Sequence, residues 1–240
     1  QDGVFKNHAL GVVTNRDAWV VNYNRNELSN NVQKLVDNYT QELSKESLDE
    51  INRNDKYIKW TKKLEDKFIK KEKLFFDDGK IVTYMYRPFV KKKLYYSEDL
   101  NERTRLYYTK WGESNLAIMT SGRGANKNFS TLVTNEIPCM DLLEKAQGFM
   151  RYDNSDKSEQ LLIDRNNINQ EFADKLGLSL DDTFAYVYGL LNSKEYQAKY
   201  ANDLKKDLAR IPIVKDKEKY VEIGKKLMDL HLNYEEVPMY

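Results

Sequence analysis

The hydrophobic periodicity of this 240-residue chain changes twice, and this limits the folds that the chain can adopt. Between Leu28 and Leu43 the apolar side chains recur every three to four residues, which is the spacing of one helix face. After the turn signal Asp-Asp-Gly at 77–79 they alternate as in a strand, and the last third returns to helical spacing. The pattern predicts an α+β fold with N-terminal helices, a small, mostly antiparallel sheet in the middle and a helical C-terminal third.

Local signals predict where the first helices and the strands lie. Asn24 and Glu27 form a capping-box pattern at the start of a helix, and residues 1–24 before it read as a connector with short extended pieces. In the polar stretch 44–73, Leu64 and Phe68 are expected to anchor one or two further helices. Strands are expected at residues 81–86, 94–96, 116–120, 129–134 and 147–152.

The C-terminal third carries its own helix signals. Ser179 and Ser193 are expected to cap two helices, and Pro212 interrupts the chain after them. A final amphipathic helix is expected over residues 217–232. Its apolar face is expected to carry Tyr220, Ile223, Leu227 and Leu230.

Composition narrows the cellular setting. A single cysteine, Cys139, excludes a disulfide within the chain, and we expect a cytoplasmic protein. No apolar run approaches the roughly 20 residues needed to cross a bilayer, so no membrane partner is expected. The chain opens with Gln1 rather than Met, which favours a fragment of a longer polypeptide.

The distribution of charge is more informative than the net charge of +1. Residues 56–110 hold 16 Lys and Arg against 8 Asp and Glu. Residues 26–55 hold 3 against 7, and residues 135–183 hold 5 against 11. A basic middle between acidic flanks is typical of a surface that meets a polyanion.

Several catalytic motifs are missing from the sequence. None of the 4 prolines adjoins another, so the Asp/Asn-Pro-Pro-aromatic motif of amino-methyltransferases is absent. No phosphate-binding Gly-x4-Gly-Lys-Ser/Thr motif occurs, and 2 histidines with 1 cysteine cannot form a usual structural zinc site. No metal or cofactor site is therefore expected in this chain.

One catalytic alternative stays open. Asp55, Glu65 and Lys67 have the residue types of a metal-dependent nuclease. A solvated helix face is the alternative, since chance matches to this pattern are common in a stretch rich in Asp, Glu and Lys. The second interpretation is favoured because the pattern falls on an expected helix, whereas such chemistry usually lies on a strand.

A basic cluster in the middle of the chain is a candidate for phosphate contacts. The alternative is a solvated edge strand guarded by lysines. The cluster, in which Tyr side chains are interleaved, comprises Lys91, Lys92, Lys93, Arg103, Arg105 and Lys110.

The polar loop 121–128 is a candidate for reading DNA bases. Arg123 has the donors to pair with guanine, and Asn126 or Asn128 with adenine, while Lys127 adds a positive charge. Two glycines allow close approach of the backbone. The alternative is an ordinary hairpin connection.

Several stretches, in this order, resemble one protein family. The resemblance runs from about residue 11 to residue 234, and the C-terminal stretches carry it most strongly. They are 11–20 (GVVTNRDAWV), 22–25 (NYNR), 86–89 (YRPF), 94–96 (LYY), 101–103 (NER), 122–137, 184–196 (FAYVYGLLNSKEY), 200–205, 210–212 (RIP) and 231–235 (HLNYE). Together they look like the C-terminal region of type ISP restriction-modification enzymes.

The resemblance implies a function and a domain order. Such enzymes join a nuclease, an ATPase, a coupler, an adenine-N6 methyltransferase and a target recognition domain, and use S-adenosylmethionine, ATP and Mg2+ upstream of this region. It implies that residues 1–24 connect to the methyltransferase domain, that 25–160 form a mixed α/β target recognition core, and that 161–240 form a helical subdomain. The chain would bind double-stranded DNA without being an enzyme itself.

A protein-interaction module is the second hypothesis. The C-terminal helices would dock on the methyltransferase or the coupler, and their aromatic side chains would supply the contact area. The alternative is that these side chains fill the core of the chain itself. They are Phe184, Tyr186, Tyr188, Tyr196 and Tyr200.

Overall fold

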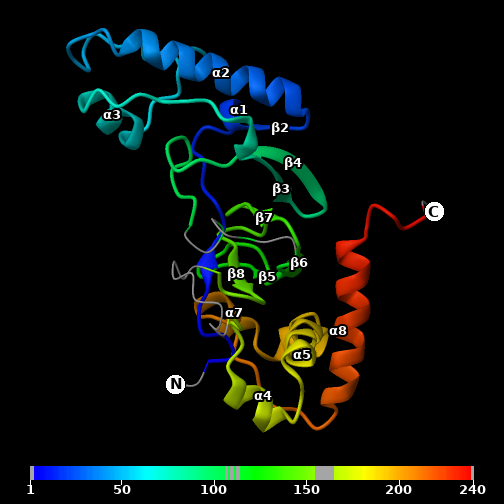
Figure 1. The fold of residues 1–240 in the computed structure, drawn as a ribbon. Coiled ribbons are helices and arrows are strands. Elements are labelled where there is room, and N and C mark those ends of the chain that lie inside the picture. Colours follow the sequence, from blue (N-terminus) through cyan, green and yellow to red (C-terminus); the bar gives the residue numbers. More distant parts are fainter. Residues whose placement is uncertain (1–2, 106–107, 109–110, 112–113, 155–164, 239–240) are drawn as a thin grey trace. The chain divides into compact units, whose positions relative to one another are not determined.

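The computed structural model describes residues 3–105, 108, 111, 114–154 and 165–238 (Figure 1). The chain divides into two compact units. Unit 1 comprises residues 1–11, 85–89 and 105–240, and unit 2 comprises residues 12–84 and 90–104. The described residues form eight α-helices and two four-stranded sheets, which confirms the α+β class but divides the strands between two sheets.

Unit 2 is built around the helix α2 (Arg25–Glu42). Asn24 caps it by accepting hydrogen bonds from the backbone N–H groups of Asn26 and Glu27, as the sequence predicts. The apolar face of α2 is buried, and the short helices α1 (Asp17–Val20) and α3 (Lys62–Ile69) complete the helical part. Leu64 and Phe68 are the buried anchors of α3, which confirms their prediction.

The second sheet has the strand order β2-β4-β3-β7. Its strands are β2 (Val21–Asn22), β4 (Val90–Tyr95), β3 (Ile81–Arg87) and β7 (Ile137–Pro138), and the 3-10 helix η1 (Asp78–Lys80) precedes β3. β2 and β4 run antiparallel, with Val21 opposite Leu94. β4 lies between β2 and β3, but the two-residue strand β2 pairs only with Leu94 and Lys93, so the edge-strand interpretation stays open at Lys91 and Lys92.

The first sheet lies in unit 1 and has the order β1-β8-β5-β6. Its strands are β1 (Ala9–Leu10), β8 (Gln147–Met150), β5 (Ala117–Thr120) and β6 (Thr131–Thr134), and all pairs are antiparallel. The register places Thr120 opposite Thr131, which fixes the ends of the loop between β5 and β6. The predicted polar loop 121–128 thus lies in a hairpin connection between two antiparallel strands.

Five helices follow the first sheet in unit 1. They are α4 (Gln170–Leu176), α5 (Leu180–Leu191), α6 (Lys194–Lys199), α7 (Ala201–Lys206) and α8 (Lys217–Leu232). Ser179 and Ser193 cap α5 and α6 through their side-chain oxygens, as expected from the sequence. Every residue from Thr183 to Leu191 is buried, so α5 is the central helix of this unit.

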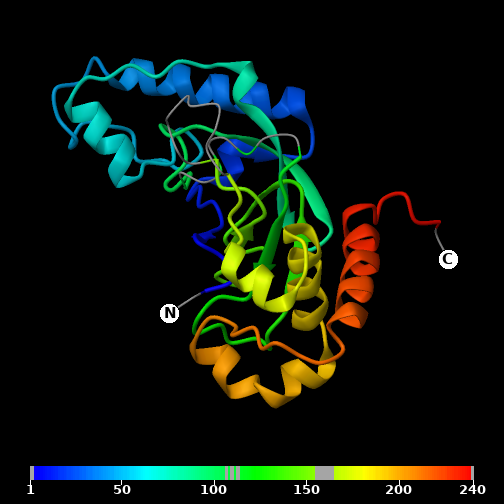
Figure 2. The same cartoon turned by 60° about the horizontal axis from the view of Figure 1, so that its bottom comes forward.

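The helices α5 and α8 lie side by side and approach unusually closely (Figure 2). A Cβ atom added at Gly224 would lie 1.9 Å from the backbone oxygen of Ala185, so only glycine fits there. The expected face of α8 was wrong in part, because Ile223 and Leu230 are 39% and 48% exposed. The packed face instead centres on Val221 and Gly224, since helix contact here depends on a small residue that an apolar pattern does not mark.

The aromatic side chains of the C-terminal third fill the core of unit 1. Phe184, Tyr186, Tyr188 and Tyr196 are at most 5% exposed, and Tyr200 is partly buried against the same cluster. The hydroxyl groups of Tyr186 and Tyr196 donate to backbone oxygens within the same unit. The contact area proposed for docking is therefore occupied within the chain itself.

Candidate nucleic-acid interface

The loop between β5 and β6 is held closed at its base. The backbone N–H of Ser121 donates to the oxygen of Ser130 over 3.0 Å, and the two side-chain hydroxyls lie 3.1 Å apart. At the next residue, Gly122, the backbone N–H donates to the oxygen of Glu144 over 3.1 Å. The loop is thus joined to a second segment of unit 1, residues 144–145.

Glu144 fixes the middle of the loop. Its Oε1 accepts hydrogen bonds from the backbone N–H and from the Nδ2 of Asn126, both over 2.9 Å. Its Oε2 accepts the backbone N–H of Lys127 over 3.1 Å. These bonds to the charged form hold the pKa of the Glu144 carboxyl below its usual value.

Two further contacts fix the loop at Gly124, which has a left-handed φ of 68°. The Nζ of Lys145 donates to the backbone oxygen of Gly124 over 2.8 Å. The backbone N–H of Gly124 donates to the oxygen of Lys205 in α7 over 3.0 Å. The loop is therefore a platform tied to two other segments, because backbone groups of four of its residues, Gly122, Gly124, Asn126 and Lys127, are hydrogen-bonded to them.

The four residues predicted to read bases occupy this platform. All of their side chains are exposed: Arg123, Asn126, Lys127 and Asn128. Asn126 differs from the expectation in one respect, because its Nδ2 already donates to Glu144. Arg123 lies beside Asp207, with 3.5 Å between its Nη2 and Oδ1 of the carboxylate.

Further polar side chains lie on other segments of unit 1. Lys206 and Arg210 are exposed at and beyond the end of α7. His8 stacks on Phe149, with 5.8 Å between the ring centroids. Its partial burial, aided by the nearby charge of Arg123, lowers the pKa of His8 from its ordinary value.

The lysines predicted to bind phosphates lie on β4 in unit 2 and are half-buried. The Nζ of Lys93 donates to the Oγ1 of Thr83 over 3.2 Å. The Nζ of Lys92 lies 4.6 Å from the ring centroid of Tyr23, which is 68% exposed. Lys92 and Lys93 are therefore engaged with neighbouring side chains, and all three lysines are partly buried.

The other three residues that were predicted to contact phosphates do not belong to β4. Arg103 is exposed, and its backbone pairs with Val13 in unit 2. Arg105, in unit 1, is half-buried, has a φ of 64° and donates from Nε to the backbone oxygen of Gly11. Lys110 lies outside the described residues.

The three nuclease-type residues each form ion pairs with partners outside the set. Asp55 pairs with Lys59, Glu65 pairs with Arg53, and Lys67 pairs with both Glu72 and Asp99. Each of the three is thus engaged with other partners. In the parts of the chain that the structure describes, no group of three or more His, Cys, Asp or Glu side chains is arranged to hold a metal ion.

Sequence reasoning missed the residues that make the loop rigid. Glu144, Lys145 and Lys205 bond to it from 18 to 81 residues away, and Asp207 lies 3.5 Å from Arg123. Glu144 and Lys145 both have left-handed φ values, 54° and 56°. No sequence motif marks such contacts. In a structure, however, two consecutive non-glycine residues with left-handed φ values are uncommon.

The geometry thus presents exposed Arg, Asn and Lys side chains on a hydrogen-bonded loop of an α+β scaffold, an arrangement suited to recognition of a ligand. The family model described as "Type ISP C-terminal specificity domain" matches residues 3–240. The chain belongs to this family, and it is the specificity domain of a type ISP restriction-modification enzyme. The resemblance noted in the sequence is thereby confirmed.

Three solved structures are similar to the chain. The DrdV–DNA complex is 32% identical, with a TM-score of 0.91, and covers 99% of this chain and 24% of its own. A nuclease-deletion mutant of the type ISP enzyme LlaGI with a DNA substrate mimic is 38% identical, with a TM-score of 0.84, and covers 99% and 19%. The ATP-dependent type ISP enzyme LlaBIII bound to DNA is 33% identical, with a TM-score of 0.87, and covers 100% and 16%.

The chain thus spans about a quarter or less of the length of each of these enzymes. Among curated proteins, none matches it. No helix in the described parts of the chain is long and apolar enough to cross a membrane.

Proposed function

We propose that this domain binds double-stranded DNA and selects the target site for a larger restriction-modification enzyme. The observation that carries the proposal is the immobilised loop 121–128, whose exposed side chains have the hydrogen-bonding groups that read base edges. A recognition loop that is preorganised before binding loses little conformational entropy on contact with DNA. Its hydrogen bonds can therefore contribute to discrimination between base pairs.

The similar structures support this proposal. Two of the three enzymes are described as bound to DNA or in complex with it, and the third as bound to a DNA substrate mimic. Each is more than 30% identical to this chain over nearly its whole length. A shared fold at this level of identity makes a shared ligand class the simplest expectation.

Within this function we assign two roles. Arg123, Lys127 and Asn128 approach base edges, and Asn126 mainly shapes the loop through Glu144. The contacts to phosphates, which give affinity without sequence information, are made by Lys91, Lys92, Lys93, Arg103, Arg105 and Lys110.

The activities of the parent polypeptide form a further part of the proposal. We assign adenine-N6 methylation, ATP hydrolysis and DNA cleavage to segments upstream of this chain, with S-adenosylmethionine, ATP and Mg2+ bound there and not here. LlaBIII is described as ATP-dependent. Residues 1–24 would connect to the methyltransferase domain, 25–160 would form the target recognition core, and 161–240 would form a helical subdomain.

Docking on the methyltransferase or coupler domain is the second candidate function. Ile223 and Leu230, one above the other on α8, are exposed although they are apolar. They offer a contact stripe that the buried aromatic side chains do not. Docking and DNA recognition are compatible roles.

The experiment is a fluorescence-anisotropy titration of random-sequence duplexes over a series of salt concentrations. We expect binding that weakens linearly with the logarithm of salt concentration, with a slope of about −0.9 per phosphate contact. If binding to the pool is salt-sensitive, duplexes that contain the preferred site can then be enriched from it. The proposal would be contradicted if this chain does not bind DNA at low salt and still does not bind after the upstream domain is attached.

A further inference from the structure

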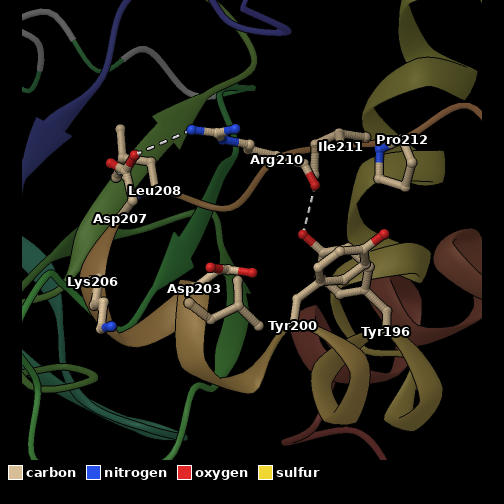
Figure 3. Close-up of a pocket in the computed structure, with 10 residues that line it drawn as sticks. Tyr196, Tyr200, Asp203, Lys206, Asp207, Leu208, Arg210, Ile211 and Pro212 are labelled. Carbon is tan, nitrogen blue, oxygen red and sulfur yellow. Dashed lines mark hydrogen bonds and ion pairs between the residues drawn. The ribbon is translucent and has the colours of Figure 1, made fainter.

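Asp207 lies between two exposed arginines of unit 1. Its Oδ1 is 3.5 Å from the Nη2 of Arg123, on the predicted reading loop. Its Oδ2 is 3.9 Å from the Nη2 of Arg210, three residues further along the chain (Figure 3). One carboxylate thus approaches two guanidinium groups, and nothing in the sequence pattern had assigned a role to either Asp207 or Arg210.

The position of the carboxylate is fixed by its own backbone. The N–H of Asp207 donates to the oxygen of Asp203 over 2.9 Å at the end of α7. The N–H of Leu208 donates to Oδ1 of Asp207 over 2.8 Å. The carboxylate therefore points in a defined direction although its side chain is 54% exposed.

Hydrogen bonds also hold α7 and the segment around Arg210 in place. α7 is tied to the reading loop, since Lys205 accepts the backbone N–H of Gly124. The backbone oxygen of Arg210 accepts the hydroxyl of Tyr196 over 2.6 Å, in the wall of a cavity of about 470 Å³ (Figure 3). The side chain of Arg210 is 88% exposed, so an anchored backbone carries a charge that a ligand in solvent can reach.

We infer that Asp207 is a positioning residue that orients Arg123 toward a guanine base, and that Arg210 is a further DNA contact. The inference rests on the proposed function. A guanidinium presents five N–H donors in a planar fork, so a carboxylate on one edge leaves the others for O6 and N7 of guanine. The same carboxylate repels phosphates, so it lowers affinity for every duplex while it raises the preference for the correct one.

The test is a double-mutant cycle in the 240-residue chain. The variants are Asp207→Asn, Arg123→Ala and the two combined, and Asp203→Asn is the matched control. Asp203 is on the same helix and lines the same cavity, but no ion pair joins it to Arg123 among the described residues. The probes are a randomised duplex pool, the duplex that the wild type enriches from it, and that duplex with single G·C pairs replaced.

Both aspartate variants are expected to bind the randomised pool more tightly, because each removes one negative charge. Only Asp207→Asn is expected to lower discrimination against one replaced G·C pair, by about two- to fivefold, the effect of an exposed ion pair. In the Arg123→Ala background this loss should vanish, because the positioned group is gone. Arg210→Ala should reduce the salt slope by about 0.9.

The inference about Asp207 is overturned if both aspartate variants change discrimination equally, or if the loss persists without Arg123. An unchanged salt slope in Arg210→Ala overturns the role of Arg210. If the wild type shows no preference for any duplex, the proposed function itself fails, and the inference fails with it. Because these side chains are exposed, we expect the variants to fold like the wild type, so differences in binding report on the DNA contacts.

Discussion

Gly122 is the position at which the smallest change should separate the reading of sequence from the binding of DNA. A Cβ atom there would lie 2.0 Å from the backbone oxygen of Lys145 and 2.8 Å from its carbonyl carbon. A carbon and an oxygen in contact are about 3.3 Å apart, so Gly122→Ala must part the two segments by about 1.3 Å. The obstructing atoms belong to the backbone and cannot rotate away.

The displacement is large compared with what the loop tolerates. The hydrogen bonds from Asn126 and Lys127 to Glu144 are 2.9 and 3.1 Å long, so a shift of this size takes them beyond hydrogen-bonding distance. Recognition requires groups held within about 0.5 Å of their working position. We therefore expect discrimination between duplexes to fall about tenfold or more, while salt-dependent binding to random duplexes persists.

The assay combines anisotropy titrations with thermal unfolding. Overpacking of this kind costs about 1–3 kcal/mol, and each kcal/mol lowers Tm by about 2–4 °C in a chain of this size. Gly124→Ala is the control. It strains a left-handed residue, but its added Cβ would meet only the side-chain Nζ of Lys145, at 3.7 Å. If Gly122→Ala keeps the discrimination of the wild type, the rigid-reader argument is wrong.

Three further predictions address the helix crossing, the loop anchor and the lysines of β4. Gly224→Ala places a Cβ 1.9 Å from the oxygen of Ala185, so we expect a loss of about 1–3 kcal/mol in thermal unfolding; an unchanged Tm would contradict the crossing geometry. The hydrogen bonds to the Glu144 carboxylate are complete above its ordinary pKa of 4.5 and are lost as pH falls through its lower pKa in the folded chain. The amide chemical shift of Asn126 should therefore titrate with a midpoint below 4.5 in an NMR experiment. A midpoint at or above 4.5 would refute this prediction. Lys91→Ala should weaken binding to all duplexes alike and reduce the salt slope by about 0.9, whereas a sequence-dependent loss would count against a phosphate contact.

Local signals allowed much of the fold to be predicted from the sequence. The caps at Asn24, Ser179 and Ser193 are formed by side chains that bond to backbone two or three residues away, so the sequence contains both partners. The bounds of α8 were also predicted correctly, because helical periodicity over 16 residues leaves little freedom. The class of the fold followed from the same short-range information.

The features that the sequence did not reveal depend on distant partners. The contact of α8 with α5 is made through Gly224, which carries no apolar signal, and two of the expected face residues are exposed as a result. β4 became an inner strand at Leu94 and Lys93 because the short strand β2, too brief for an alternating pattern, pairs with it there. Glu144 immobilises the loop across 18 residues, and no local rule predicts such a pairing.

The central claim is that the loop 121–128 reads sequence. The most direct measurement compares the wild type with Arg123→Ala on the enriched duplex and on the same duplex with each base pair replaced in turn. We predict that Arg123→Ala loses about five- to 150-fold in discrimination at one G·C pair and little elsewhere. A uniform weakening at every position, with the preference for that pair intact, would contradict the account.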